Sequence, residues 1–200
     1  MENEIINDEM NCNGKLPNSR RNDAIFMVVA SGLMTALITI ATMTVKVPIP
    51  GAAGYVHLGD AMIFLTILFL GMKYGTVSAA LGSALGDIIG GYAVWAPWTL
   101  GIKGLMALVM GLILHLAFKK ATTVTNAKFI PLVYIPAMLV GGIIMTCGYY
   151  FAEGIMYGNW VAALTSIPWN VTQFVVGMIV ASLISTALLK TSAKKLFIYY

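Results

Sequence analysis

The hydrophobic positions of the chain fall into six long runs separated by short polar or aromatic connections. A membrane-spanning helix needs about 20 apolar residues to cross a hydrocarbon core of roughly 30 Å. We therefore expect spanning helices over Ala24–Val45, Leu58–Met72, Tyr74–Tyr92, Leu100–Phe118, Phe129–Phe151 and Ile167–Leu189. The pattern predicts an all-α integral membrane protein with six transmembrane helices, built as one membrane domain over residues 24–189.

Composition supports the membrane interpretation. Of the 200 residues, 59% are hydrophobic and 10% are charged, with a mean hydropathy of +0.85, whereas a soluble domain carries about 25% charged residues. The net charge of +4 therefore bears on orientation in the membrane. No basic patch is interleaved with base-stacking aromatic residues, so we expect no nucleic-acid partner.

The basic residues cluster at alternate ends of the predicted helices. They are Arg20, Arg21, Lys73, Lys119, Lys120, Lys128, Lys190, Lys194 and Lys195. The positive-inside rule makes that side cytoplasmic, so both termini are expected inside. Residues 1–23 then form a polar cytoplasmic tail, and residues 190–200 form a basic one. The connections on the opposite side contain only Lys46 as a clear basic residue.

The opposite, outer side is rich in aromatic residues. It carries all four tryptophans and several tyrosines: Trp95, Trp98, Trp160, Trp169, Tyr55, Tyr92, Tyr149, Tyr150 and Tyr157. An ordinary interfacial belt decorates both membrane surfaces. The one-sided distribution favours an aromatic-lined pocket that opens outward and suits a flat ring, although a belt remains the alternative.

Few polar residues lie within the membrane segments, and each is costly there. Asp87 and Lys103 fall at a similar depth, where they could form an ion pair or reach into a cavity. Glu153 ends the fifth run. Asn170 and Gln173 lie three residues apart and so share a helix face, and their amides suit the edge of a heterocycle.

Two ionisable residues precede the second run, in "GYVHLGDAMIFL". Asp60 is expected in the first turn of a helix, where a carboxylate meets free N–H groups and the positive end of the dipole. His57 and Tyr55 come just before it and are candidates for a lid over a ligand. His115, near the inner end of the fourth run, reads as a plain interfacial residue.

Several kinds of chemistry are excluded. The sequence has no H-E-x-x-H, no G-x-S-x-G and no phosphate-binding G-x-x-x-x-G-K-[ST] loop. Cys12 and Cys147 lack the spacing of a metal or redox site. We expect neither an enzyme nor a bound metal or cofactor.

Small residues recur at four-residue intervals, as in Gly32-x-x-x-Ala36 and Gly82-x-x-x-Gly86. Such spacing lets helix backbones approach closely in lipid. It indicates packing within the protein or docking onto another membrane protein, and the pattern alone does not choose between them.

Three stretches resemble the substrate-binding S components of energy-coupling-factor (ECF) vitamin transporters. They are "VPIPGAAGYVHLGDAMIFL", "GSALGDIIGGYAVWAPWTLGIKGLMALVMGLI" and "IPWNVTQFVVG". The resemblance covers about Ala24 to Leu189 and points to the branch that includes riboflavin, hydroxymethylpyrimidine and pyridoxine proteins. It implies a multi-pass protein of the bacterial plasma membrane that binds a vitamin from outside. It also implies partners, namely a membrane scaffold subunit and two cytoplasmic ATPases.

The resemblance also implies site residues. The family's docking motif corresponds to Gly32 and Ala36. The ligand pocket maps near Tyr55, Lys103, Tyr149, Glu153, Trp160, Asn170 and Gln173, to which the polar pattern adds His57 and Asp87.

We expect a pyridine or pyrimidine vitamin, pyridoxine or hydroxymethylpyrimidine, with riboflavin as the alternative. A stand-alone secondary carrier or an integral membrane enzyme would be the rival classes.

Overall fold

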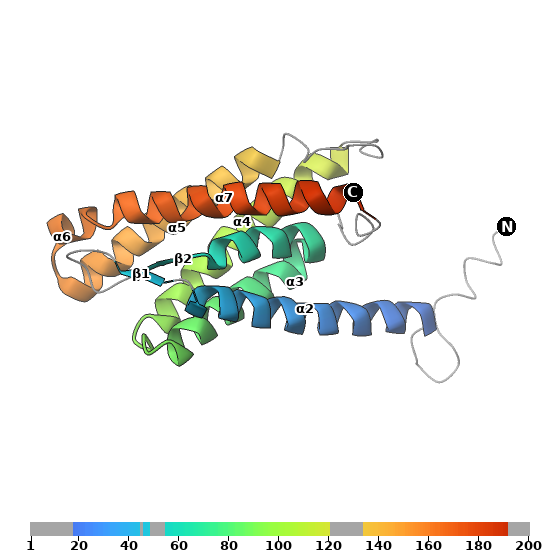
Figure 1. Cartoon of the computed structure of the whole chain (residues 1–200), viewed down its shortest axis with the longest axis horizontal. Helices are drawn as coiled ribbons and strands as arrows, with labels where there is room; N and C mark the ends of the chain where they lie inside the picture. The colour runs from blue at the N-terminus through green and yellow to red at the C-terminus, as the bar shows by residue number, and fades with distance from the viewer. Residues whose placement is uncertain (1–17, 45, 49–54, 121–133, 192–200) are drawn as a thin grey trace.

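The computed structural model describes residues 18–44, 46–48, 55–120 and 134–191, which form a bundle of long helices with a small two-stranded hairpin at one end (Figure 1). The elements are α2 (Asn18–Thr44), β1 (Lys46–Pro48), β2 (Tyr55–His57), α3 (Gly59–Ile89), α4 (Ala96–Lys120), α5 (Tyr134–Tyr157), α6 (Trp160–Leu164) and α7 (Ile167–Leu189). Most of the predicted tails, and the predicted helix start at Phe129, lie outside the described residues.

The described residues contain five helical segments long and apolar enough to cross a membrane. They are Ala24–Thr44, Gly59–Ile89, Ala96–Phe118, Tyr134–Tyr157 and Trp160–Leu189. The all-α membrane class is thus confirmed, but six separate spanning helices are not. The difference lies in α3, which joins the second and third predicted segments.

Gly71 bends α3 back on itself. Its φ of 69° and ψ of −172° are not helical, and essentially only glycine adopts this conformation. Beyond the bend, a Cβ built on Gly75 would lie 3.2 Å from the Cα of Ile67. Eight residues of straight helix would separate these positions by about 12 Å, so the two halves of α3 lie against each other. The predicted boundary at Lys73, between Met72 and Tyr74, falls two residues after the bend.

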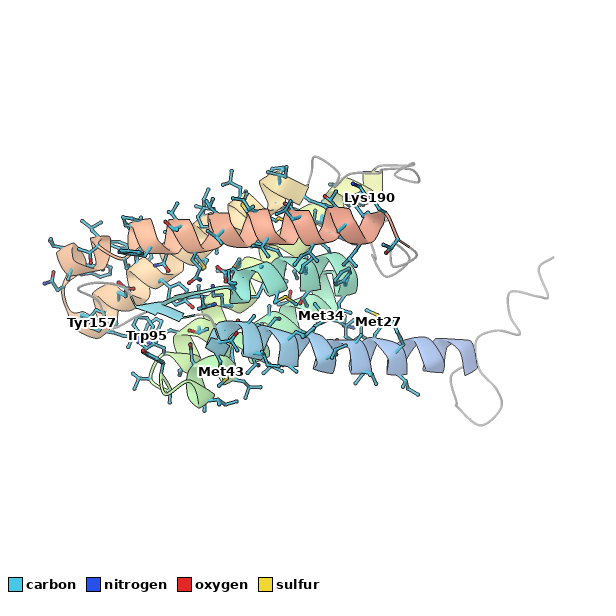
Figure 2. The ribbon with its side chains drawn as sticks, in the orientation of Figure 1. Met27, Met34, Met43, Trp95, Tyr157 and Lys190 are labelled. Carbon is cyan, nitrogen blue, oxygen red and sulfur yellow. The ribbon has the colours of Figure 1, made fainter. Side chains whose placement is uncertain are left out.

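The β1–β2 hairpin was not predicted. Its strands pair antiparallel with Lys46 opposite His57 and Pro48 opposite Tyr55. The hairpin caps the bundle beside α2 and α7, and we call this the hairpin end (Figure 1). Lys73 and Lys190 belong to the other end, as the basic pattern required; Lys190 is labelled there in Figure 2.

Small residues on the second half of α3 pack inside the protein. A Cβ on Gly82 would lie 2.8 Å from the Thr35 carbonyl oxygen, and one on Gly86 would lie 2.8 Å from Thr42. The Thr39 hydroxyl donates to the Gly82 carbonyl at 2.9 Å across this contact. Close approach of α2 and α3 therefore depends on glycine at these positions.

The other small pair on α2 behaves differently. Gly32 and Ala36 are exposed, and a Cβ on Gly32 would have no atom within 4 Å. This face is not used for packing within the described bundle. Packing within the protein therefore accounts for Gly82 and Gly86 but not for Gly32 and Ala36.

Large apolar side chains occupy both the interior and the outside of the bundle. Phe64, Ile63, Met106 and Met138 are fully buried. Many others face outward, including Ile25, Leu33, Leu105, Ile143 and Leu183. Such a surface suits hydrocarbon rather than water.

Candidate functional site

A buried ion pair lies near the middle of the bundle. The ammonium group of Lys103, on α4, contacts the Asp60 carboxylate, on α3, and both side chains have 0% exposure. The Lys103 Nζ also lies 2.8 Å from the Met145 sulfur and 5.4 Å from the centre of the Tyr149 ring. The charge is therefore neutralised and surrounded by soft, polarisable groups.

Gln173 connects this pair to the hairpin. Its Nε2 donates to Asp60 Oδ2 at 2.9 Å, and its Oε1 accepts from the His57 backbone N–H at 3.0 Å. His57 Nδ1 accepts in turn from the Gly59 N–H at 3.0 Å. A continuous set of hydrogen bonds thus runs from α7 through α3 to the strand that precedes it.

Aromatic side chains lie one helical turn closer to the hairpin end. The Thr99 and Tyr149 hydroxyl oxygens are 3.2 Å apart. The Trp95 ring centre is 6.2 Å from that of Tyr149 and 6.1 Å from that of Tyr157. Figure 2 shows Trp95 and Tyr157 together at the hairpin end. These contacts offer flat apolar faces with hydroxyl groups at their edges.

A second buried carboxylate belongs to the same region. Glu153 is 4% exposed, and its Oε2 has no hydrogen-bond partner among the described residues. The Ser166 hydroxyl can donate to this carboxyl group, but it also lies 2.9 Å from the Ala163 carbonyl oxygen. One hydroxyl proton is therefore shared between two acceptors.

Helical spacing explains why these residues gather. Residues four apart share a helix face and rise by about 6 Å. Three faces of this kind meet. The first is Thr99 and Lys103 on α4, with Trp95 in the turn just before it, where its carbonyl accepts from the Thr99 N–H at 2.9 Å. The second is Met145, Tyr149 and Glu153 on α5, and the third is Ser166, Asn170 and Gln173 at the start of α7. We call these nine residues, with Asp60 and His57, the polar column. The ion pair lies at one end of the column, and the aromatic rings and the Glu153 carboxyl group lie at the other.

The structure brings six of the predicted site residues into this column: His57, Lys103, Tyr149, Glu153, Asn170 and Gln173. Trp160 is 45% exposed and packs instead on Tyr150 and Phe151 at the bundle surface. Tyr55 lies in β2, and only its backbone is described.

The suggested pairing of Lys103 with Asp87 is wrong. Lys103 pairs with Asp60 instead, which lies at the start of the first half of α3. Asp87 is buried in the other half of α3, and none of the contacts described for the column includes it. Asp60 lies in the first turn of its helix as expected, but its carboxylate bonds to side chains of α4 and α7.

Sequence reasoning did not name five members of the polar column as site residues: Asp60, Trp95, Thr99, Met145 and Ser166. The four-residue spacing of Trp95, Thr99 and Lys103, and that of Met145, Tyr149 and Glu153, was a usable signal. Among the described residues, no group of three histidine, cysteine or acidic side chains could hold a metal ion.

Comparison with known proteins identifies the family. The family model described as "ECF-type riboflavin transporter, S component" matches residues 22–190. An uncharacterised protein of Pyrococcus woesei is 36% identical over 72% of this chain and 88% of its own length. The "Thiamine precursor transporter HmpT" of Lactococcus lactis is 25% identical over 85% of this chain and 92% of its own length. A UPF0397 protein of Streptococcus pneumoniae is 31% identical over 52% of this chain and 54% of its own length.

The family model spans every long helix of the bundle and the whole polar column. Members of this family are substrate-binding subunits of vitamin transporters in the cell membrane and are not enzymes. The chain therefore belongs to the ECF-type riboflavin transporter S component family.

Proposed function

We propose that this S component binds hydroxymethylpyrimidine, or a closely similar pyrimidine or pyridine vitamin such as pyridoxine, for import by an ECF transporter. The observation that carries the proposal is the match to the thiamine precursor transporter HmpT, which extends over 92% of that protein. The match covers 85% of this chain.

The composition of the column supports a small heterocycle. Trp95 and Tyr149 offer ring faces, while Asn170 and Glu153 offer hydrogen-bonding groups within about two helical turns. The inner end is closed by the self-paired charges of Lys103 and Asp60. Such a site combines apolar walls with a few polar groups that fix the orientation of a flat ligand.

Riboflavin is the second candidate, because the description of the matching family model names it. Equilibrium binding to the purified chain, in detergent or nanodiscs, distinguishes these vitamins. We expect the pyrimidine to bind most tightly, followed by pyridoxine. Tighter binding of riboflavin would overturn the order, and no binding of any of the three would overturn the proposal.

The partners follow from the family and belong to the same proposal. We propose that the chain joins a membrane scaffold subunit and two cytoplasmic ATPases, with Gly32 and Ala36 at the contact. The open, exposed face at these residues supports that role. Vitamin uptake that persisted without the ATPases would favour a stand-alone carrier instead.

A further inference from the structure

The two buried carboxylates of the polar column are satisfied to very different degrees. Asp60 has a cation on one oxygen and an amide N–H on the other. Glu153 has at most a shared hydroxyl on one oxygen and nothing on Oε2 among the described residues. No ion pair to Glu153 occurs within this part of the chain. A buried carboxylate normally has several donors, so this shortage needs an explanation.

The ammonium group of Lys103 does not serve as the donor for Glu153. Lys103 is two helical turns away along the column and is committed to Asp60, Met145 and the Tyr149 ring. None of the described residues supplies the missing donor for Glu153 Oε2.

The side chains around Glu153 indicate what kind of ligand could supply the missing donor. Tyr149 lies one turn below it on α5, and the Trp95 ring packs against both Tyr149 and Tyr157. These rings favour a flat, aromatic partner. Asn170 is 6% exposed and lies one turn beyond Ser166, to whose carbonyl its backbone N–H donates at 2.9 Å. Its amide adds a donor and an acceptor for the remaining polar positions of a ring.

We infer that Glu153 is the specificity-determining residue of the site, and that its carboxyl group binds the amino-bearing edge of an aminopyrimidine. This inference rests on the proposed function and narrows it to one substrate class. A carboxylate only accepts hydrogen bonds, so its complement is an edge that donates. The exocyclic amine supplies such an N–H, and protonation of the neighbouring ring nitrogen supplies a second one in parallel. Two parallel N–H groups match two carboxylate oxygens, which is the strong bidentate arrangement.

The same geometry discriminates against other ligands. A vitamin that carries its own carboxylate would place like charges together in a buried site, and it is excluded. A ring with a methyl group in place of the amine has the same shape but leaves the Glu153 carboxylate without its donor. Loss of a buried partner of this kind is a strong basis for selectivity.

The test compares two ligands of equal shape on three forms of the full chain. The ligands are 4-amino-5-hydroxymethyl-2-methylpyrimidine and the analogue with methyl in place of the amine. Wild-type protein is expected to prefer the amine by about tenfold or more, as expected for one charge-assisted hydrogen bond. Glu153→Gln, which keeps the shape of the side chain, should remove most of this preference. Glu153→Asp keeps the carboxylate, so it should retain the preference while binding both ligands more weakly.

The results of this test distinguish the proposed role of Glu153 from the proposed vitamin specificity. Equal binding of amine and methyl analogue by wild-type protein, or an unchanged preference in Glu153→Gln, would overturn the role of Glu153 and leave the vitamin assignment standing. Failure of wild-type protein to bind the amine, pyridoxine or riboflavin would overturn both. The wild-type comparison needs no variant, so it decides the matter even if a substitution prevents folding.

Discussion

The ammonium group of Lys103 lies against the carboxylate of Asp60, and neither side chain is exposed. Removing one partner of a buried ion pair leaves an uncompensated charge, which costs about 3–5 kcal/mol. We expect Asp60→Asn and Lys103→Met each to lower the free energy of unfolding by about 3–5 kcal/mol. The loss should appear as a lower melting temperature of the purified protein in detergent. The double variant removes both charges and should be more stable than either single variant. Additive losses in the double variant would contradict a direct coupling.

Gln173 ties the hairpin to the bundle through two buried hydrogen bonds. Gln173→Leu leaves the His57 N–H and one Asp60 oxygen without their partners. We expect a loss of about 1–3 kcal/mol and faster hydrogen exchange at the His57 amide. Thr172→Val, at an exposed neighbouring position, is the control and should change stability by less than about 0.5 kcal/mol. Equal effects of the two substitutions would argue against the connection.

The bend at Gly71 requires a conformation that other residues avoid. Its φ of 69° should make Gly71→Ala cost about 1–3 kcal/mol, measured by thermal unfolding. Gly101 is exposed within α4, with no atom within 4 Å of an added Cβ, so Gly101→Ala should be neutral or slightly stabilising. If both alanines behaved alike, the bend would not depend on glycine.

Gly32 and Ala36 mark an open face of α2, so larger residues there should not disturb the fold. We expect Gly32→Leu and Ala36→Leu to abolish co-purification with the scaffold and ATPase subunits. Vitamin affinity and melting temperature should stay unchanged. Val29→Leu, at another exposed position on the same helix, is the control for added bulk. If both Gly32→Leu and Ala36→Leu assembled normally with the scaffold and ATPase subunits, the scaffold would have to dock elsewhere.

Trp95 and Trp160 were both expected on the aromatic side of the molecule, but only Trp95 joins the polar column. Trp95→Leu should weaken vitamin binding by about tenfold, through loss of a ring face. Trp160→Leu should leave affinity within about twofold, because its ring packs on Tyr150 and Phe151. Titration of the same vitamin against both variants checks this. A larger loss of affinity in Trp160→Leu than in Trp95→Leu would indicate that Trp160 contacts the vitamin.

Much of the polar column was predictable, because polar residues are rare within membrane segments. Lys103, Glu153, Asn170 and Gln173 stand out for that reason alone, and the structure gathers them. Asp60 was recognised as a residue of a helix start, but its partners were not. Its Lys103 partner is 43 residues away, and its Gln173 partner is 113 residues away. No local pattern specifies which of several buried charges will meet.

The sequence by itself determined the membrane class, the apolar runs that form the long helices and the gathering of aromatic residues in a few connections. These properties follow from local hydropathy and from helical spacing, which act over a few turns of chain. Only the tertiary structure decided that Gly71 folds α3 into two packed halves. It also decided that Gly82 is buried against α2 while Gly32 faces open space. Finally, it decided that Lys103 pairs with Asp60 rather than with Asp87. These outcomes depend on how helices rotate and pack against one another, and that is fixed by contacts between residues far apart in the chain.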